Sequence, residues 1–330
     1  MGTKIESLVM TGVQEMTLRS ECAIPLPESD YVRVKVHSCG ICGSDMHAYH
    51  GHDERRQPPI VLGHEVVGWL EENNRKTRVA INPLMTCGDC SACSAGREHL
   101  CPNREMIGMR LPGGFAAEVV IKRDNLWSLP PELSFDLAVL AEPLACSIHA
   151  VRLAARHSEI SLQDSVITIL GGGAIGLLIA QVLIADGVQR LSIVEAHAGR
   201  RQVLKELLPE AEIFAPENAQ PQQDMIFDAV GSGITRKVSS ELVVSGGVIL
   251  HIGLQNSEAG LDTRRMTLQE VCVLGCYCYG NQDFFEALDR LARGDIRGGA
   301  WLDYRALSAG AEAFNELHTG SDFMKIVLQL

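Results

Sequence analysis

Four cysteines, Cys87, Cys90, Cys93 and Cys101, stand close together in the stretch CGDCSACSAGREHLC. The spacing C-x2-C-x2-C-x7-C allows one loop to place four thiolates around a tetrahedral zinc ion. Four thiolates fill the coordination sphere and leave no position for water or substrate, so the predicted zinc site is structural. An iron–sulfur cluster is the alternative occupant, and burial of the thiols without a metal is a further alternative.

A second set of possible metal ligands is spread along the chain. One thiolate, one imidazole and one or two carboxylates can hold zinc and keep a position for a substrate, as a catalytic metal requires. Spacing alone does not distinguish such residues, because a cysteine can be buried in a turn, a histidine can cap a strand and a glutamate can begin a helix. The residues are Cys42 in CGSDMH, His64 and Glu65 in GHE, and Glu142 in AEPLAC.

The stretch LGGGAIG has the spacing of a dinucleotide-binding turn, G-x-G-x-x-G, formed by Gly171, Gly173 and Gly176. The first glycine permits the tight turn after a strand, the second lets the backbone approach a pyrophosphate, and the third lets the helix pack closely on the strand. The N-terminus of that helix offers free N–H groups and the positive end of its dipole to phosphates. Ile175 lies in the same turn and is counted with the glycines as a candidate cofactor-binding residue.

Glu195 ends the next strand-like run, LSIVE, at the place where a cofactor ribose is bound in such folds. A carboxylate there hydrogen-bonds the ribose hydroxyls of NAD and repels the additional phosphate of NADP, so NAD is the predicted cofactor. His197, Arg200 and Arg201 follow closely and could instead accept that phosphate. The alternative is that the arginines lie on a solvated helix face, with Arg200 stacked on the adenine.

Hydrophobic patterning divides the chain into a β-rich part and an alternating part. Residues 1–146 contain short extended runs separated by turn residues, which is typical of an antiparallel, barrel-like domain. Residues 147–281 alternate strand-like runs with helical stretches, which predicts a doubly wound parallel sheet of the Rossmann type and an α/β fold class. Residues 282–330 contain a further helix and a final strand, and are predicted to return to the first domain. The strand-like runs of the alternating part are VITIL, LSIVE, AEIF, MIFDAV, VILHIG and VCVLGC.

Charge and composition exclude several classes of protein. The formal net charge of -12 repels phosphate backbones, which argues against nucleic-acid binding. No apolar run follows a basic start, so no secretory signal is evident and a cytoplasmic location is expected. The charge-free stretch 166–185 is interrupted by three glycines, which favours a buried strand, turn and helix over a membrane span. The 11 cysteines are an odd number, and metal binding or burial explains them better than a disulfide framework.

In its order of motifs, the chain resembles the zinc-dependent medium-chain alcohol dehydrogenases over nearly its whole length. The resemblance implies a GroES-like catalytic domain with a structural-zinc lobe, joined to a Rossmann domain. It implies that Cys42 and His64 bind the catalytic zinc, and that Glu65, Glu142 or a water completes the coordination sphere. Liver-type members place a cysteine where EPLA has glutamate, so the chain is most similar to the polyol branch, the sorbitol, galactitol-phosphate and butanediol dehydrogenases. The motifs are GICGSDMH, LGHEVVG, the four-cysteine loop, GGFAAEVV, EPLACSIHAV, LGGGAIG, FDAVG and KIVL.

The resemblance also implies a reaction, the oxidation of a secondary alcohol (a polyol, a sugar alcohol or its phosphate, or a diol) to a ketone. The substrate hydroxyl binds at the open position of the metal, which lowers its pKa, and its carbon gives a hydride to the nicotinamide of NAD. Ser44 takes the hydroxyl proton, the ribose hydroxyl passes it on, and His47 delivers it to solvent, since histidine titrates near neutral pH. Asp45 orients a metal-bound imidazole. The alternative for His47 is an exposed turn residue.

The residues that set the substrate are less specific. GCYCYGN resembles a segment that lines the polyol pocket, but Cys278 stands where sorbitol-type members carry arginine, which argues against sorbitol. Phe115 is either an apolar wall of the pocket or part of the barrel core. We expect Arg55 and Arg56, shortly before the GHE motif, to lie in a solvated loop; contact with a substrate phosphate or carboxylate is the alternative.

Two other functions and the assembly state are part of the same hypothesis. An L-threonine 3-dehydrogenase-like activity is the alternative among enzymes, although those members carry aspartate where Glu142 stands. A zinc-binding family member without activity is the alternative outside enzymes. Members of the family assemble through the edge of the nucleotide sheet, so a homodimer or homotetramer is expected, with no nucleic-acid or membrane partner.

Overall fold

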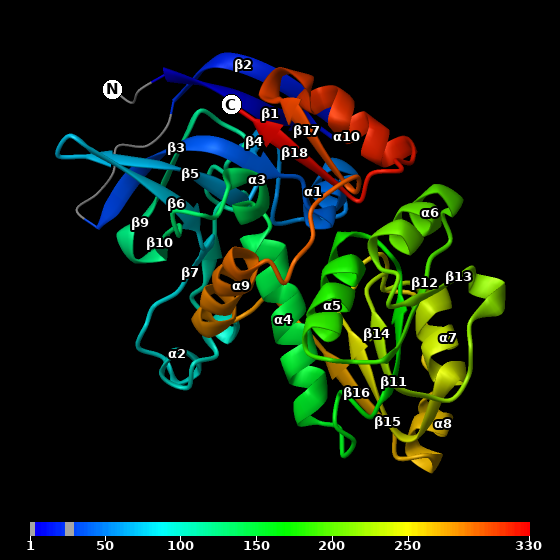
Figure 1. The fold of residues 1–330 in the computed structure, drawn as a ribbon. Helices are drawn as coiled ribbons and strands as arrows, with labels where there is room; N and C mark the ends of the chain where they lie inside the picture. Colours follow the sequence, from blue (N-terminus) through cyan, green and yellow to red (C-terminus); the bar gives the residue numbers. More distant parts are fainter. Residues whose placement is uncertain (1–3, 24–29) are drawn as a thin grey trace. The chain divides into compact units, whose positions relative to one another are not determined.

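The computed structural model describes residues 4–23 and 30–330, and the chain divides into two compact units (Figure 1). The first, here called the β-rich unit, comprises Met1–Glu142, Gly280–Arg293 and Leu302–Leu330. The second, the α/β unit, comprises Pro143–Tyr279 and Gly294–Trp301. The chain therefore passes from the β-rich unit to the α/β unit after Glu142 and returns at Gly280. It enters the α/β unit a second time for the short segment 294–301.

The β-rich unit is built on a seven-stranded sheet in the order β10-β6-β5-β3-β18-β17, with β9 paired to β3. Two smaller sheets, β2-β1-β4 and β7-β8, complete it. The strands are β1 (Lys4–Gly12), β2 (Glu15–Ala23), β3 (Tyr31–Gly40), β4 (Ile60–Val61), β5 (Glu65–Glu72), β6 (Arg75–Ile81), β7 (Leu84–Met85), β8 (Glu105–Met106), β9 (Glu118–Lys122), β10 (Leu126–Ser128), β17 (Leu302–Ala306) and β18 (Lys325–Gln329).

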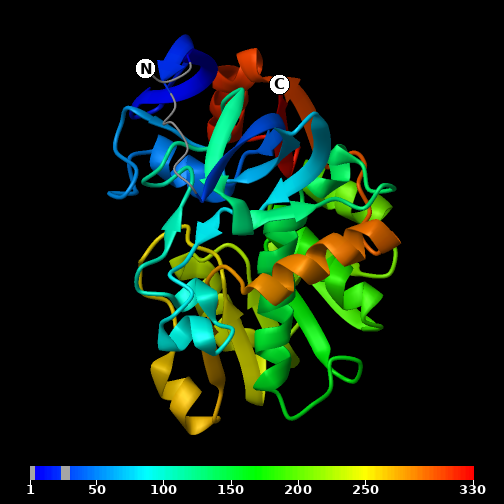
Figure 2. The same cartoon turned by 90° about the vertical axis from the view of Figure 1, so that its left-hand side faces the viewer.

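Short helices connect these strands. Those of the β-rich unit are α1 (Gly43–Tyr49), α2 (Ser91–Ser94), α3 (Phe135–Ala138), α9 (Asn281–Arg293) and α10 (Gly310–Thr319), with the 3-10 turns η1 (Glu98–Leu100), η2 (Arg123–Asn125) and η4 (Leu307–Ala309). Figure 2 shows that the last elements, in orange to red, are built into the same unit as the blue N-terminal strands.

Buried and less buried residues alternate along β3 and β9 of the main sheet, and the turn between β5 and β6 carries residues suited to it. β5 and β6 are joined by Asn73 and Asn74, whose φ angles are 50° and 60°. Asparagine adopts this left-handed conformation more readily than most residues, and two such residues in succession fit a tight hairpin turn. The core beneath the sheet includes Phe115, which is fully buried and contacts Phe314 edge-on at 5.8 Å. Of the two alternatives for Phe115, the structure supports burial in the barrel.

The α/β unit contains a six-stranded sheet in the order β13-β12-β11-β14-β15-β16, with all neighbouring strands parallel. Counted from the first strand of the unit, this order is 3-2-1-4-5-6, the doubly wound arrangement of dinucleotide-binding folds. The predicted α/β fold class and Rossmann sheet are confirmed. The strands are β11 (Val166–Leu170), β12 (Arg190–Val194), β13 (Glu212–Phe214), β14 (Gln223–Asp228), β15 (Val243–His251) and β16 (Cys272–Gly275).

Helices follow these strands as the alternating pattern predicts. The stretch 166–185 consists of β11, a glycine turn and α5, and its strand and helix side chains are mostly buried. Across the part of the chain that the structure describes, no helix is both long enough and apolar enough to cross a bilayer. The helices are α4 (Ala141–Arg156), which begins in the β-rich unit, α5 (Ala174–Ala185), α6 (Ala198–Leu207), α7 (Gly233–Leu242) and α8 (Thr263–Leu268), with the 3-10 turn η3 (Pro216–Asn218).

Candidate active site and metal centres

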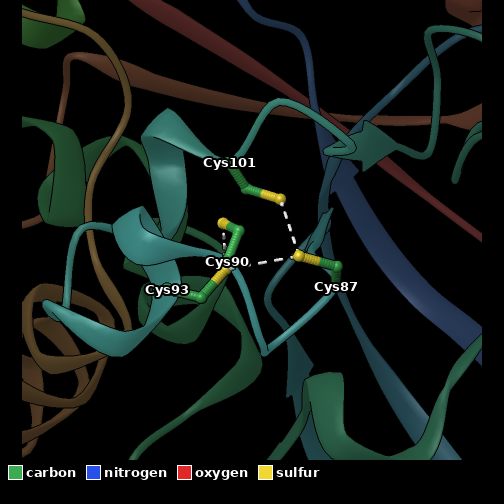
Figure 3. Close-up of side chains that lie close together, drawn as sticks. All are labelled: Cys87, Cys90, Cys93 and Cys101. Atoms are coloured by element: carbon green, nitrogen blue, oxygen red, sulfur yellow. Dashed lines mark hydrogen bonds between the residues drawn. The ribbon is translucent and has the colours of Figure 1, made fainter.

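The four cysteines of the opening motif converge in the loop between β7 and β8 (Figure 3). Their sulfur atoms lie 3.4 Å apart for Cys101 and Cys87, 3.5 Å for Cys90 and Cys93, and 4.0 Å for Cys87 and Cys93. Four thiolates bound to one zinc ion at the usual bond length of 2.3 Å lie about 3.8 Å from one another. The sulfur positions therefore fit a tetrahedral zinc site, and the four ligands would leave no position for a substrate.

A second group of donor atoms comes from residues far apart in the sequence. Cys42, His64 and Glu65 each offer a donor atom, and these atoms lie within 4.8 Å of one another. The sheet explains the convergence, because β3 pairs antiparallel with β5 and places Gly40 opposite Glu65. The chain just beyond the end of β3 and the chain just before β5 consequently meet at one edge of the sheet.

Cys42 is held at the start of α1 by helix capping. Its Sγ accepts the backbone N–H of Ser44 at 3.5 Å, while the carboxylate of Asp45 accepts the N–H of Cys42 at 3.0 Å. This reciprocal arrangement is a capping box, and it fixes both side chains at the first turn. The local sequence C-G-S-D therefore determines where the thiol points.

Asp45 is the residue that connects the ligands. It is fully buried, and its Oδ1 lies 3.5 Å from Nδ1 of His64. Burial by itself raises the pKa of Asp45, but His64 and Arg56 outweigh it and the pKa lies below its usual value. An anionic Asp45 facing one imidazole nitrogen leaves the other nitrogen for a metal, which is the orientation expected of a metal-bound histidine.

Glu65 pairs with a buried lysine, Lys325, that belongs to none of the candidate site motifs. Nζ of Lys325 donates to both carboxylate oxygens of Glu65, at 2.6 and 2.8 Å, and to the carbonyl of Ile41 at 3.0 Å. Burial lowers the pKa of Lys325, but Glu65 outweighs this effect and the pKa is raised. The sequence signal was a lysine at the head of the apolar strand KIVLQL, since a lysine is rarely buried unless it is paired.

Glu142 stands apart from this group. It is buried in the first turn of α4, and its donor atoms are not among those that cluster within 4.8 Å in the described residues. Its negative charge contributes to the raised pKa of Lys325. The structure thus brings together Cys42, His64 and Glu65 and places Glu142 outside the immediate donor set.

The two predicted relay residues lie on α1, three positions apart and therefore on neighbouring parts of one helix face. Oγ of Ser44 accepts a hydrogen bond from Arg56 at 3.2 Å. His47 is half-buried, and its pKa is lowered by burial and by the positive charges of His52 and Arg56. A neutral imidazole at this place can accept a proton at neutral pH.

The expectation of a solvated loop for both arginines is wrong for Arg56. Its side chain has no exposed surface, whereas that of Arg55 is 49% exposed and is ion-paired with Asp53 at 2.9 Å. Neither pattern nor composition distinguishes the two neighbours, because the difference arises from how the loop folds back on α1.

The glycine turn of the α/β unit has the geometry that its spacing predicts. Gly171 has a φ of +97°, and a Cβ on Gly176 would lie 1.9 Å from the carbonyl oxygen of Gly171. Gly173 is the N-cap of α5, and a Cβ there would meet no atom within 4 Å. The first and third glycines are therefore required by the fold, while the second faces open space at the helix N-terminus. Ile175 lies in the first turn of the same helix, partly buried.

Glu195 follows β12 and is buried, with its carboxylate bound to backbone amides. Its two oxygens accept the N–H groups of Gly172 and His197, each at 2.7 Å. The guanidinium of Arg201 donates to the carbonyls of Glu195 and Ala196, at 2.9 and 2.7 Å. Of the basic residues that could accept a second phosphate, Arg201 thus binds backbone carbonyls, while Arg200 lies in the first turn of α6, where its N–H donates to Nδ1 of His197 at 3.4 Å.

Comparison with known proteins assigns the family. The alcohol dehydrogenase GroES-like domain matches residues 28–131, and the zinc-binding dehydrogenase domain matches residues 174–293. L-galactonate-5-dehydrogenase of Escherichia coli K12 is 31% identical over 299 residues, which cover 86% of this chain and 86% of that enzyme. The chain belongs to the zinc-dependent medium-chain alcohol dehydrogenase family. The predicted family is confirmed.

Two further proteins are similar to this dehydrogenase over almost its full length, one in sequence and one in structure. D-arabitol-phosphate dehydrogenase of Enterococcus avium is 28% identical over 332 residues, covering 94% of this dehydrogenase and 92% of the relative. The crystal structure of a zinc-binding dehydrogenase of Sinorhizobium meliloti 1021 bound to NADP has a TM-score of 0.87 and 27% identity, and the match covers 99% and 100% of the two chains. Relatives named for a polyol phosphate and a sugar acid support the polyol branch.

The glycine turn gives a paired prediction. We expect Gly176→Ala to lower the free energy of unfolding by about 2–3 kcal/mol, because its Cβ would overlap the Gly171 carbonyl. Gly173→Ala should change that free energy by less than about 0.5 kcal/mol, yet weaken NADH binding roughly tenfold by crowding the pyrophosphate. Denaturant unfolding and NADH fluorescence titration measure the two effects. Wild-type stability of Gly176→Ala would contradict the packing argument.

The four-cysteine site gives a second prediction. Cys93→Ser should lower the zinc content by one equivalent per chain and the melting temperature by roughly 5–15 °C, because structural zinc binding is coupled to folding. Cys272→Ser, on β16 of the other unit, is the matched control and should retain wild-type zinc content. Elemental analysis and calorimetry supply the readouts. An unchanged zinc content in Cys93→Ser would remove the structural-metal assignment.

Proposed function

We propose that this dehydrogenase oxidises a secondary alcohol of a polyhydroxylated substrate to a ketone, with NAD as hydride acceptor. The substrate classes are polyols, sugar alcohols or their phosphates, sugar acids and diols. The observation that carries the proposal is the convergence of Cys42 and His64 beside Ser44 on α1. A metal-ligand pair next to a hydroxyl that can relay a proton is the equipment that alcohol oxidation needs.

Cys42 and His64 are the proposed ligands of the catalytic zinc, and Glu65, Glu142 or a water completes the sphere. When bound, zinc supplies Lewis-acid chemistry that lowers the pKa of a substrate hydroxyl. The structure favours a minor role for Glu65, because both of its oxygens are already bound to Lys325.

Ser44 and His47 are the proposed proton pathway. Ser44 would take the proton of the substrate hydroxyl and give up its own, and His47 would release the proton to solvent. The ribose hydroxyl of a bound cofactor would supply the link between the two residues. The lowered pKa of His47 suits this role, because a neutral imidazole is the form that accepts a proton. The half-buried position of His47 also supports a link between the interior and solvent.

We propose separate roles for three stretches of the chain. Residues 1–146 and 282–330 supply the metal ligands and the relay, and residues 147–281 bind the dinucleotide through Gly171, Gly173, Ile175, Gly176 and Glu195, with Arg200 beside the adenine. A cytoplasmic location suits metal sites built on reduced thiols. Assembly as a homodimer or homotetramer is proposed through the edge strand β16, where Val273 and the neighbouring Leu268 are exposed.

The relay is tested by Ser44→Ala. We expect kcat to fall about 100- to 1000-fold, because general acid–base transfer contributes about that much, while zinc content and NADH affinity stay unchanged. Ser128→Ala, at an exposed position on β10, is the control and should keep the wild-type rate. Wild-type turnover of Ser44→Ala would refute the proposed proton pathway.

Cofactor and substrate are tested together in a spectrophotometric screen. We expect kcat/KM with NAD to exceed that with NADP by at least about tenfold, and Glu195→Ala to reduce this ratio by removing the carboxylate that repels a 2′-phosphate. Polyols, sugar phosphates, sugar acids, diols and L-threonine are compared by the formation of reduced cofactor. A clear NADP preference of the wild-type enzyme would reject the cofactor assignment, and turnover of L-threonine alone would favour the threonine-dehydrogenase alternative.

A further inference from the structure

Arg55 and Arg56 are adjacent, and both pair with Asp53, yet only one of them is buried. Nε of Arg55 lies 2.9 Å from Asp53 with the side chain 49% exposed, whereas Nε of Arg56 lies 3.4 Å from Asp53 with the side chain fully buried. The burial of Arg56 therefore does not follow from its partner in the loop. It follows from contacts that Arg56 makes on its far side.

Those contacts are with the first turn of α1. Nη1 of Arg56 donates to the backbone carbonyl of Ser44 at 2.7 Å and to Oδ1 of Asp45 at 3.3 Å. Nη2 donates to Oγ of Ser44 at 3.2 Å. One planar guanidinium thus contacts the carbonyl and hydroxyl oxygens of Ser44 and one oxygen of Asp45, and the carboxylate of Asp53 lies 3.4 Å from its Nε. A fork of this shape requires arginine, because the ammonium of lysine is a single point of attachment.

Burying a cation is expensive. Removing a guanidinium from water costs several kcal/mol, and a buried ion pair is often no more stabilising than apolar residues of the same volume. Arg56 is accompanied by two carboxylates, Asp45 and Asp53, which makes its burial tolerable. Active sites are among the places where buried charges are arranged in this way.

The donor and acceptor positions of the Ser44 hydroxyl indicate the role of Arg56. A serine hydroxyl has one donor and two acceptor positions. Arg56 occupies one acceptor position, so one acceptor and the donor remain. A proton relay needs that remaining pair, the acceptor for the substrate hydroxyl and the donor for the ribose hydroxyl. With the first acceptor position filled, the hydroxyl hydrogen of Ser44 is directed away from the guanidinium.

We propose that Arg56 is a positioning residue for the proton relay, which acts by fixing the rotamer and hydroxyl direction of Ser44 and by clamping Asp45 against the metal ligands. The inference rests on the relay described under the proposed function. Arg56 itself touches neither substrate nor cofactor in this assignment. Its role differs from the two expected from the sequence, a solvated loop residue and a substrate-anion contact.

The experiment is a double-mutant cycle. Arg56→Lys keeps the charge and removes the fork, so kcat should fall about 10- to 100-fold while KM changes less than about threefold. Zinc content and NADH affinity should stay at wild-type values, because Asp45 keeps its bond to the Cys42 N–H. Arg55→Lys, the exposed neighbour with the same carboxylate partner, is the matched control and should leave kcat unchanged.

The second arm places Arg56→Lys in the Ser44→Ala background. If Arg56 acts through Ser44, the additional substitution should lower kcat less than about twofold there, since residues that act as a unit are not additive. An equal fall in both backgrounds would show a merely structural role and overturn the inference. Wild-type kcat of Arg56→Lys beside a slow Ser44→Ala would overturn it as well, and would leave the proposed relay standing.

Two further outcomes are distinguished by these measurements, the absence of a relay and the failure of Arg56→Lys to fold. Wild-type turnover of Ser44→Ala would remove the relay and the Arg56 inference together. Should Arg56→Lys fail to fold, Asp53→Asn removes the negative charge that lies 3.4 Å from Nε of Arg56 and leaves the contacts to Ser44 in place. It should lower kcat about three- to tenfold, again only while Ser44 is present. A rate equal to that of the wild type in Asp53→Asn would then contradict the inference.

Discussion

The candidate active site depends on one buried carboxylate. Asp45 has no contact with solvent, accepts the N–H of Cys42, faces Nδ1 of His64 and pairs with Arg56. Because an anion in a low-dielectric interior must be compensated, each of these groups is held where it can supply a hydrogen or a positive charge. The carboxylate thereby connects the cap of α1, one metal ligand and the loop that carries the arginine.

A second buried ion pair balances the other side of the donor group. Lys325 and Glu65 neutralise each other's charge close to Cys42 and His64. Lys325 also donates a hydrogen bond to the carbonyl of Ile41, the residue before Cys42. Lys325 comes from the last strand of the chain, 260 positions from Glu65, whereas Arg56 comes from the loop 11 positions after Asp45. Each ion pair costs desolvation, and breaking either would leave an uncompensated charge in the interior. The rigidity that results suits a site in which ligands and relay must keep fixed positions.

Much of the fold was accessible from pattern alone. All six strands of the parallel sheet coincide with apolar runs in the sequence. The inner strands β11 and β12 are almost entirely buried because both of their faces are covered, whereas the edge strand β16 alternates between partly buried and exposed residues. The return of the last strand to the β-rich unit was also anticipated. β17 and α10 were not predicted from the sequence. The strand LDYRA is mostly only partly buried, so its hydrophobic pattern is weak, and only the short turn η4 separates it from α10. The motifs in their order assigned the family before any contact was known.

The sequence by itself determined the parts that are local. Four cysteines on one loop, a capping turn around Cys42 and a glycine turn before α5 are each set by residues a few positions apart. Tertiary structure decided what depends on distant strands meeting. The pairing of β3 with β5 and β18 brings His64, Glu65 and Lys325 to the N-terminal end of α1, which Cys42 caps. The folding of one loop buries Arg56 and leaves Arg55 partly exposed to solvent. Burial and charge pairing are properties of the packed chain, so a pattern of residue types cannot assign them.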